Sequence, residues 1–305
     1  MKYLQLFFLF ALSLHSAELL PHLRKIEKRI HATSIEGVDC TYLINLDERR
    51  DRLNECLQNL LPFGILPQRF PAIYGWRIPL EEYADLGVKF GPGMWPGKEN
   101  ALLAVPNRGF FFVQLSEAFY GQTFFSGWLT PGALGCTLSH LSVLQDALDA
   151  GYETIWVLED DFVLIENPHL LSGKIEELDR LVGASGWDVL YTDSDYLFGV
   201  DPTQDLQAQL PMKWRPDRPD FDLKTLLGST PVGDGFLKIG SRIGTHSMMI
   251  RRSGVEKILR FNKEHGIFMP YDHEIAFVPD IRLYALKQPI VGAHAKPSDT
   301  KNQYF

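Results

Sequence analysis

A short apolar run that ends in three consecutive acids constrains the fold of this chain more than any other feature. Residues 155–158 are all apolar, and Glu159, Asp160 and Asp161 follow them directly. Such a run is typical of a strand that is buried on both faces of a parallel sheet. Ligands of open α/β sheets bind outside the carboxyl ends of the strands. We therefore expect the three acids at a ligand-binding edge, because neighbouring carboxylates repel one another unless a cation or charged ligand lies among them.

Predicted strands and helices alternate along the middle of the chain. Apolar runs predict strands at residues 40–46, 68–73, 155–158, 187–191, 245–251, 282–286 and 288–291. Apolar residues at helical spacing predict helices at residues 48–61, 131–150, 172–182 and 253–261, and a short helix after residue 270. This alternation favours an α/β fold with a mostly parallel mixed sheet flanked by helices.

Capping residues predict where three of these helices begin. Asp47 is placed to cap the helix that follows the first strand. Thr130 precedes a proline, a pair that is typical of a helix start. Ser253 and Glu256 have the spacing of a capping box.

Composition limits the classes of protein to consider. The chain has 305 residues, and a hydrophobic content of 45% is enough for a sizeable core. The net charge is −8 and no dense basic block occurs, so we expect no nucleic-acid partner. The three cysteines, Cys40, Cys56 and Cys136, form no CxxC motif and lie in apolar segments. They are interpreted as buried free thiols, with a disulfide as the alternative.

The N-terminus resembles a targeting segment. Lys2 precedes an apolar run, and small residues follow that run, so residues 1–17 have the layout of a secretory signal peptide. We expect an exported or membrane-associated protein. The alternative is an uncleaved anchor, with peripheral association at the cytoplasmic face, because the lead-in at residues 18–37 is basic. A single domain is predicted at residues 38–297, with irregular inserts at residues 87–128 and 198–244, before a tail at residues 298–305.

A second acidic cluster is expected to join the first. Asp193 and Asp195 follow the predicted strand at residues 187–191. Oxygen ligands at this density suit Mg²⁺ or Mn²⁺, so Glu159, Asp160, Asp161 and Asp193 are candidate metal ligands. The alternatives are a polar turn with a helix-capping acid for the first cluster, and a surface Asx turn for the second.

Several other residues carry chemistry that such a site could use. Arg49 and Arg52 follow the first strand and could bind a diphosphate, above a floor that ends at Asn45. Asp272 and Glu274 are candidate general bases, with helix capping as the competing role. His140 lies in the middle of a predicted helix, where a hydrogen-bonded core histidine competes with a binding role. His294 could supply a nitrogen ligand to a metal or belong to the core.

Parts of the sequence resemble a known protein family. Several ordered segments are similar to motifs of glycosyltransferase family 25, which includes lipopolysaccharide galactosyltransferases and procollagen galactosyltransferases. These segments are residues 43–53, 69–75, 132–140 and 151–161. They contain Asn45, Asp47, Arg49, Arg52, Ser139 and His140, which we take as candidate donor-binding residues.

The resemblance implies a fold and a reaction. The fold would be GT-A-like and nucleotide-binding, and residues 159–161 would match the metal and diphosphate motif of the family. The reaction would move a hexose, typically galactose, from a UDP-sugar to a hydroxyl of a glycan, a lipopolysaccharide or a protein, with inversion. Asp193 to Asp195 would resemble a second acidic motif, and residues 270–272 a late motif near the acceptor, so that Asp272 or Asp195 takes the acceptor proton.

Two rival functions use similar residues. A glycoside hydrolase also relies on paired carboxylates but needs neither metal nor nucleotide. A non-catalytic, exported sugar- or calcium-binding protein would fit the signal-like N-terminus.

Overall fold

The computed structural model describes residues 18–30, 34–193, 214–218, 223–293 and 299–300 of the chain. The predictions for the first 17 residues, Asp195 and His294 therefore lie outside the described residues. Among those described, no helix is both long enough and apolar enough to cross a membrane.

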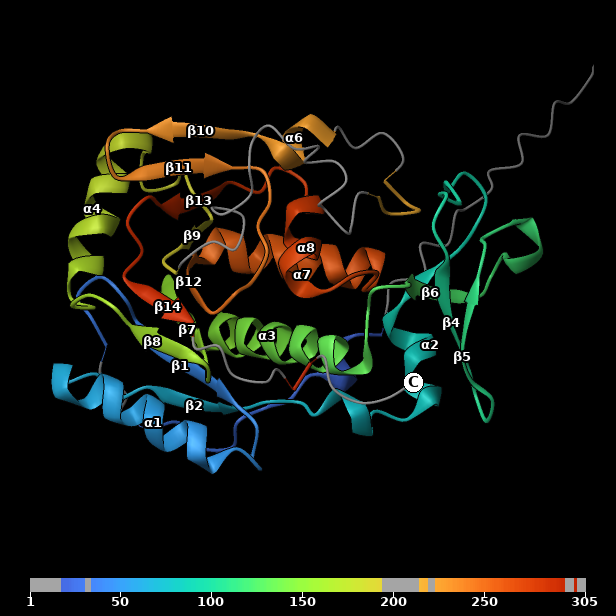
Figure 1. Cartoon of the computed structure of the whole chain (residues 1–305), viewed down its shortest axis with the longest axis horizontal. Coiled ribbons are helices and arrows are strands. Elements are labelled where there is room, and N and C mark those ends of the chain that lie inside the picture. The colour runs from blue at the N-terminus through green and yellow to red at the C-terminus, as the bar shows by residue number, and fades with distance from the viewer. Residues whose placement is uncertain (1–17, 31–33, 194–213, 219–222, 294–298, 301–305) are drawn as a thin grey trace, which may run out of the picture.

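A large mixed sheet forms the centre of the molecule (Figure 1). Its eight strands follow the order β10-β11-β13-β9-β12-β7-β1-β2. In chain order these strands are β1 Cys40–Asn45, β2 Gln68–Pro71, β7 Thr154–Glu159, β9 Val189–Tyr191, β10 Ser229–Val232, β11 Phe236–Ile239, β12 Ser247–Arg251 and β13 Leu283–Leu286. The pairs β1–β2, β1–β7 and β9–β13 are parallel, and the remaining pairs are antiparallel. The predicted α/β architecture with a mixed sheet is confirmed, but four of its seven strand pairs are antiparallel, so the sheet is not mostly parallel as expected.

Strand directions bring four chain segments to one edge of this sheet. β12 runs antiparallel to both β7 and β9, while β1 runs parallel to β7. The carboxyl ends of β1, β7 and β9 therefore meet the amino end of β12 at the same edge. Asn45, Glu159, Asp193 and His246 lie at these four strand ends.

Helices cover both faces of the sheet, as predicted. On one face, α3 Pro131–Ala150 and α7 Arg252–His265 pack against each other, and the core there contains Ile155 and Val157 of β7. On the other face, α1 Arg50–Leu60 and α4 Leu170–Val182 contribute to a second core that contains Trp156 and Leu158. Alternation of side chains along a strand explains why a fully apolar β7 can fill both cores.

The helix start predicted at Thr130 is confirmed, and the other two are wrong. The Thr130 hydroxyl accepts a hydrogen bond from the amide of Ala133 at 3.0 Å. Asp47 does not cap α1, which begins at Arg50, because its carboxylate binds Arg69 at 2.6 Å instead.

The predicted capping box of α7 does not form either. The helix begins one residue earlier, at Arg252. Ser253 donates its hydroxyl hydrogen bond to Asp188, and Glu256 accepts one from Arg252. Both side chains that would have formed the box are therefore engaged elsewhere.

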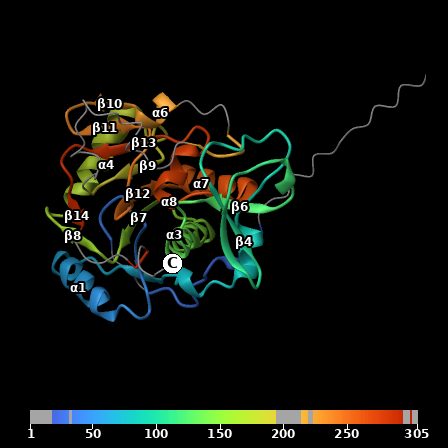
Figure 2. The ribbon, with the colours of Figure 1, turned by 45° about the vertical axis from the view of Figure 1, so that its right-hand side comes forward.

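The predicted irregular insert at residues 87–128 is instead a second, antiparallel sheet, which lies beside the main body (Figure 2). Its strands are β3 Val88–Lys89, β4 Ala101–Val105, β5 Gly109–Val113 and β6 Thr123–Ser126, in the order β3-β6-β4-β5. Phe124 and Phe125 of β6 are fully buried, and they belong to the same hydrophobic core as Ile155 and Val157 of the main sheet. Gly91 to Gly97 form a loop, as predicted.

The other predicted insert, at residues 198–244, is also more regular than expected in its described part. β10 and β11 form a hairpin that extends the main sheet. The remaining short elements are α2 Tyr83–Leu86, α6 Leu223–Leu227, α8 Tyr271–Glu274, and the paired strands β8 Phe162–Leu164 and β14 Val291–Ala293. Single 3-10 turns are η1 Leu20–His22, η2 Leu61–Phe63, η3 Gly75–Arg77, η4 Leu80–Glu82, η5 Glu117–Phe119 and η7 Ile275–Phe277.

Candidate functional site

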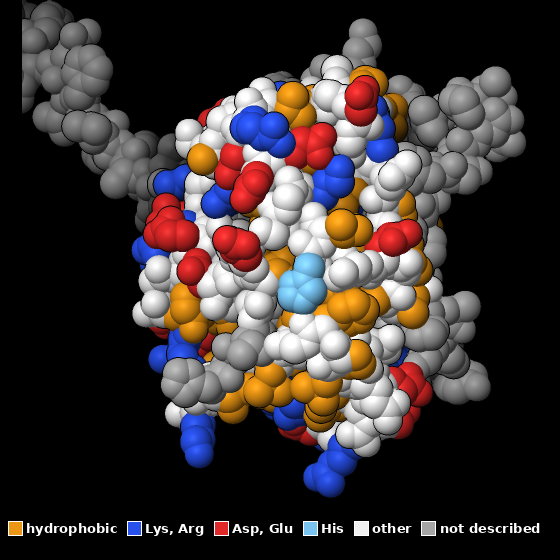
Figure 3. Space-filling view, turned by 90° about the vertical axis from the view of Figure 1, so that its left-hand side faces the viewer, with side chains coloured by type: hydrophobic (Ala, Val, Ile, Leu, Met, Phe, Trp, Pro, Cys, Tyr) orange, Lys and Arg blue, Asp and Glu red, His pale blue; other side chains and the backbone are white. Residues whose placement is uncertain are grey.

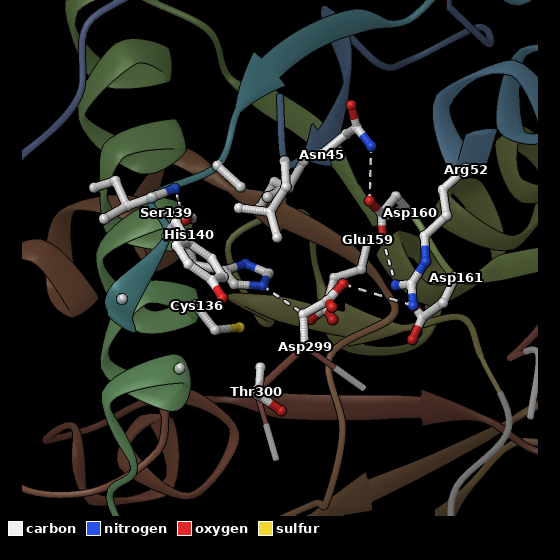
Figure 4. Close-up of a pocket in the computed structure, with 17 residues that line it drawn as sticks. Asn45, Arg52, Cys136, Ser139, His140, Glu159, Asp160, Asp161, Asp299 and Thr300 are labelled. Carbon is white, nitrogen blue, oxygen red and sulfur yellow. Dashed lines mark hydrogen bonds and ion pairs between the residues drawn. The ribbon is translucent and has the colours of Figure 1, made fainter. Parts of the chain in front are cut away.

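A cleft lies where β1 and β7 end, with α3 along one side (Figure 4). It holds about 600 Å³ of space not filled by atoms, part of it open to solvent. Seven of the predicted site residues line it: Asn45, Arg52, Ser139, His140, Glu159, Asp160 and Asp161. The lining also includes residues 72–75, Cys136, Asp299 and Thr300. The face on the left of Figure 1 carries acidic, basic and hydrophobic side chains mixed together (Figure 3).

Glu159 is held by hydrogen bonds from two directions. Its Oε1 lies 3.0 Å from Nε2 of His140 and accepts a hydrogen bond from the hydroxyl of Thr245 at 2.6 Å. Burial acts to raise the pKa of Glu159, but His140, His246 and Thr245 together lower it to about 2. Glu159 is therefore ionised and oriented at neutral pH.

Asp160 holds Arg52 in place. Its carboxylate accepts hydrogen bonds from the side-chain amide of Asn45 at 2.7 Å and from Nη1 of Arg52 at 3.1 Å. Burial raises the pKa of Asp160 despite these donors. Because both oxygens are engaged, Asp160 acts mainly as an anchor for the Arg52 guanidinium.

Asp161 is the acid with unused hydrogen-bonding capacity. Its Oδ2 lies 3.6 Å from Nε2 of His246. Its Oδ1 is buried and has no hydrogen-bond partner among the residues that the structure describes. Burial and the charge of Glu159 raise the pKa of Asp161 to about 6. A buried carboxylate oxygen without a donor, beside a second acid, fits a hard divalent cation such as Mg²⁺ or Mn²⁺.

His246 connects the two predicted acidic clusters. Its Nδ1 lies 3.5 Å from Oδ2 of Asp193, and its other ring nitrogen faces Asp161. Burial acts to lower the pKa of His246, but Asp193, Glu159 and Asp161 together raise it to about 9. The sequence predicts His246 within a strand and indicates no role for it. His246 lies at the amino end of β12, which antiparallel pairing brings beside the acidic ends of β7 and β9.

Asp193 lies behind the cleft rather than in its lining. The side chain is almost fully buried, and its Oδ1 pairs with Nη2 of Arg242 at 2.8 Å. The two predicted acidic strand ends do converge, as expected. Asp193 is linked to Asp161 through the imidazole of His246, and its role as a metal ligand stays a prediction.

The predicted arginine pair converges on the cleft residue Asp299, although of the two arginines only Arg52 lines the cleft. Nη1 of Arg49 lies 3.0 Å from each carboxylate oxygen of Asp299, and Nη2 of Arg52 lies 3.7 Å from the same group. Asp47 faces away from the cleft lining, toward Arg69 and Arg24. The pair can therefore receive an anionic group, and a residue near the C-terminus does so here.

Ser139 positions the wall of the cleft. Its hydroxyl donates to the carbonyl of Gly135 at 2.7 Å and accepts from the amide of Ile73 at 2.8 Å. Gly75 allows this close contact, because a Cβ there would lie 1.8 Å from the carbonyl oxygen of Pro131. Two of the segments that carried the family resemblance, residues 69–75 and 132–140, therefore pack closely and are linked through the Ser139 hydroxyl.

Three donor atoms of different chemistry meet on the α3 side of the cleft. Cys136 and His140 extend from α3 toward the acids (Figure 4), and the Cys136 sulfur, a His140 nitrogen and a Glu159 oxygen all lie within 4.8 Å of one another. His140 is almost fully buried and stacks on Tyr271, with the ring centroids 4.4 Å apart. Cys136 had been interpreted only as a buried thiol. Its spacing of four residues from His140 on a predicted helix was the missed signal.

Neither described candidate base lines the cleft. The Asp272 carboxylate accepts hydrogen bonds from the amides of Gly244 at 2.9 Å and His273 at 3.0 Å. Burial raises the pKa of the cleft thiol Cys136, and the charges of Glu159 and Asp272 add to this shift. Glu274 is fully buried in an ion pair with Arg215 and accepts from the amide of Met269. Its carboxylate is thus engaged in the core and lies outside the cleft lining, and its role as a general base stays a prediction.

Comparisons with known proteins agree on one family. Residues 39–195 match the model described as "Glycosyltransferase family 25 (LPS biosynthesis protein)". A "Glycosyltransferase 25 family member" of Aedes aegypti is 28% identical over 155 residues, which are 51% of this chain and 21% of that protein. "Procollagen galactosyltransferase 1" of Danio rerio is 28% identical over 157 residues, which are 51% of this chain and 21% of that protein.

A relative whose name states inactivity matches to a similar degree. The human "Inactive glycosyltransferase 25 family member 3" is 27% identical over 157 residues, which are 51% of this chain and 22% of that protein. The matched part of the chain thus spans about a fifth of the length of these curated relatives.

Proposed function

The chain belongs to glycosyltransferase family 25, and on that premise we propose that it transfers a hexose, galactose by preference, from a UDP-sugar to an acceptor hydroxyl. One observation carries the proposal. The cleft lining combines Asp299, the acid that Arg49 and Arg52 hold, with a buried carboxylate oxygen of Asp161 that has no hydrogen-bond partner among the described residues. A nucleoside diphosphate bound to a divalent cation supplies what both features need.

The arginines recognise the diphosphate in the proposed complex. Arg52 is held in place by Asp160, so little side-chain entropy is lost when a phosphate binds. Arg49 is partly exposed and exchanges its present partner, Asp299, for phosphate oxygens. This assignment keeps Arg49 and Arg52 as donor-binding residues and gives Asn45 a supporting role through Asp160.

Asp161 and Glu159 would hold the divalent cation, and Mg²⁺ or Mn²⁺ fits their oxygen atoms. When bound, the ion supplies charge neutralisation for the departing UDP. His246 orients Asp161 from behind, while His140 and Thr245 orient Glu159. These side chains fix the two acids before any donor binds, which lowers the reorganisation needed during the reaction.

The proposed transfer is an inverting displacement in a GT-A-like fold. The acceptor oxygen attacks the anomeric carbon, the bond from that carbon to the UDP oxygen breaks, and the acceptor proton passes to a carboxylate. Asp272 is the described candidate for this base, because it follows Tyr271, which stacks on the cleft residue His140. The acceptor would be a glycan, a lipopolysaccharide or a protein hydroxyl. Residues 1–17 would export the protein or attach it to a membrane.

The test is turnover of a panel of UDP-hexoses, measured as UDP release without an acceptor. We expect hydrolysis with Mn²⁺ or Mg²⁺, its loss in EDTA, and a strong decrease in Asp161→Asn. Asp149→Asn is the matched control, because this exposed acid near the end of α3 lies outside the cleft lining.

Different failures would exclude different parts of the proposal. Full turnover in EDTA and in Asp161→Asn would exclude the proposed role of the cation. If calorimetry detects no binding of UDP, a UDP-sugar is excluded as the donor, and the glycoside hydrolase or the non-catalytic binding protein is favoured.

A further inference from the structure

We infer that Cys136, His140 and Glu159 form a three-ligand binding site for a thiophilic divalent cation of the Zn²⁺ or Co²⁺ class, separate in chemistry from the oxygen site on Asp161. One donor atom from each residue lies within 4.8 Å of the other two. Zinc ligands bind at about 2.0 to 2.3 Å, which places neighbouring ligand atoms of a tetrahedral site about 3 to 4 Å apart. Small side-chain rotations are therefore enough to close the site.

Local structure supports each ligand. Cys136 and His140 are four residues apart on α3, so both face the same side of the helix. Tyr271 stacks on the His140 ring with an interplanar angle of 16°, which restricts its rotation. Thr245 donates to Glu159 at 2.6 Å and orients its carboxylate. Supporting contacts of this kind are typical around metal ligands.

The donor set selects the class of ion. One sulfur, one nitrogen and one oxygen suit Zn²⁺ and its spectroscopic substitute Co²⁺, whereas Mg²⁺ prefers oxygen alone. All three side chains line the cleft, so a fourth position would face the cavity and accept water or a ligand oxygen. Sites with three protein ligands and one open position are typical of reactive rather than purely structural zinc. Binding replaces the thiol hydrogen by a sulfur–metal bond and releases that proton to solvent.

This site shares Glu159 with the proposed donor site, but its test needs no nucleotide. The chelator-treated full chain is titrated with Co²⁺ while visible and near-ultraviolet absorption are recorded. The expected result is one bound ion with a thiolate-to-cobalt charge-transfer band. Cys136→Ser should lose the band and bind Co²⁺ at least about tenfold more weakly. Cys40→Ala removes a thiol that lies outside the cleft lining and should retain the band.

Two outcomes would overturn the inference. The first is Co²⁺ binding by the unmodified chain without a charge-transfer band, which needs no variant and so cannot be attributed to misfolding. The second is a spectrum that Asp161→Asn abolishes and Cys136→Ser leaves intact, which would place the ion on the carboxylates alone. Neither outcome bears on UDP-hexose turnover, so this site and the proposed donor chemistry can fail separately.

Discussion

The carboxylate of Asp299 binds the guanidinium of Arg49 through both of its oxygens, each 3.0 Å from Nη1. The backbone around Asp299 is docked as well: its carbonyl accepts from the Trp76 indole at 3.1 Å, and the Thr300 carbonyl accepts from the Thr130 hydroxyl at 2.7 Å. Gly132 permits this approach, since a Cβ there would lie 2.7 Å from Cα of Thr300. A residue near the C-terminus thus occupies the arginine pair that we assign to the donor diphosphate.

Removing the Asp299 charge should therefore strengthen UDP binding. We expect Asp299→Asn to lower the Kd for UDP by up to about fivefold, because the pair is partly exposed and such pairs contribute up to about 1 kcal/mol. Calorimetry at constant ionic strength measures this. Asp51→Asn is the matched control, as Asp51 contacts Arg49 from outside the cleft lining. Weaker UDP binding in Asp299→Asn would mean that Asp299 positions the arginine instead of competing for it.

Arg52 should matter for stability as well as for binding. It is almost fully buried against Asp160, so Arg52→Gln leaves a buried carboxylate without its cation. We expect a loss of about 3 kcal/mol in the free energy of unfolding in urea, together with weaker UDP binding. Arg77→Gln breaks the exposed pair with Glu48 and should change stability by no more than about 0.5 kcal/mol. Equal stability of the two variants would contradict a buried anchoring role.

Stability should fall as the pH rises from about 6.5 to 9, in part through His246. The folded-state pKa of His246 is raised to about 9, above its ordinary value of about 6.5. Its contribution is therefore complete below pH 6.5 and is lost as the pH rises through 9, with a total on the order of 3 kcal/mol. Urea unfolding in EDTA, at several pH values, should show a steeper decline for the unmodified chain than for His246→Gln. If stability declines equally steeply with pH in the unmodified chain and in His246→Gln, His246 does not make this contribution.

The proposed base predicts a kinetic signature. Asp272→Asn keeps the side-chain size and should lower kcat by about 10² to 10⁴, with little change in the KM for the donor. The Asn oxygen can still accept from the Gly244 amide, which limits structural damage. Asp234→Asn, at an exposed position, should leave kcat unchanged. If donor hydrolysis and transfer to an acceptor both persist at full rate in Asp272→Asn, another group takes the proton.

Local sequence signals predicted the parts of the fold that depend on neighbouring residues. Thr130 caps α3 because its hydroxyl needs only the amide three residues later. The apolar run before Glu159 forms a strand buried on both faces because its side chains alternate between two cores. Where the same kind of signal failed, a distant partner had outcompeted the local one: Arg69 binds Asp47, and Asp188 accepts from Ser253.

The sequence by itself determined that three acids follow a buried strand, because apolar periodicity and charge are properties of contiguous residues. Only the tertiary structure decided what each acid does. Asp160 meets Arg52 across 108 positions, Glu159 meets Thr245 across 86, and Arg49 meets Asp299 across 250. Contacts at such separations depend on strand order, strand direction and helix packing, which no local pattern encodes. The different roles of the three acids therefore depend on the folded chain, although their presence at the sheet edge could be predicted from the sequence.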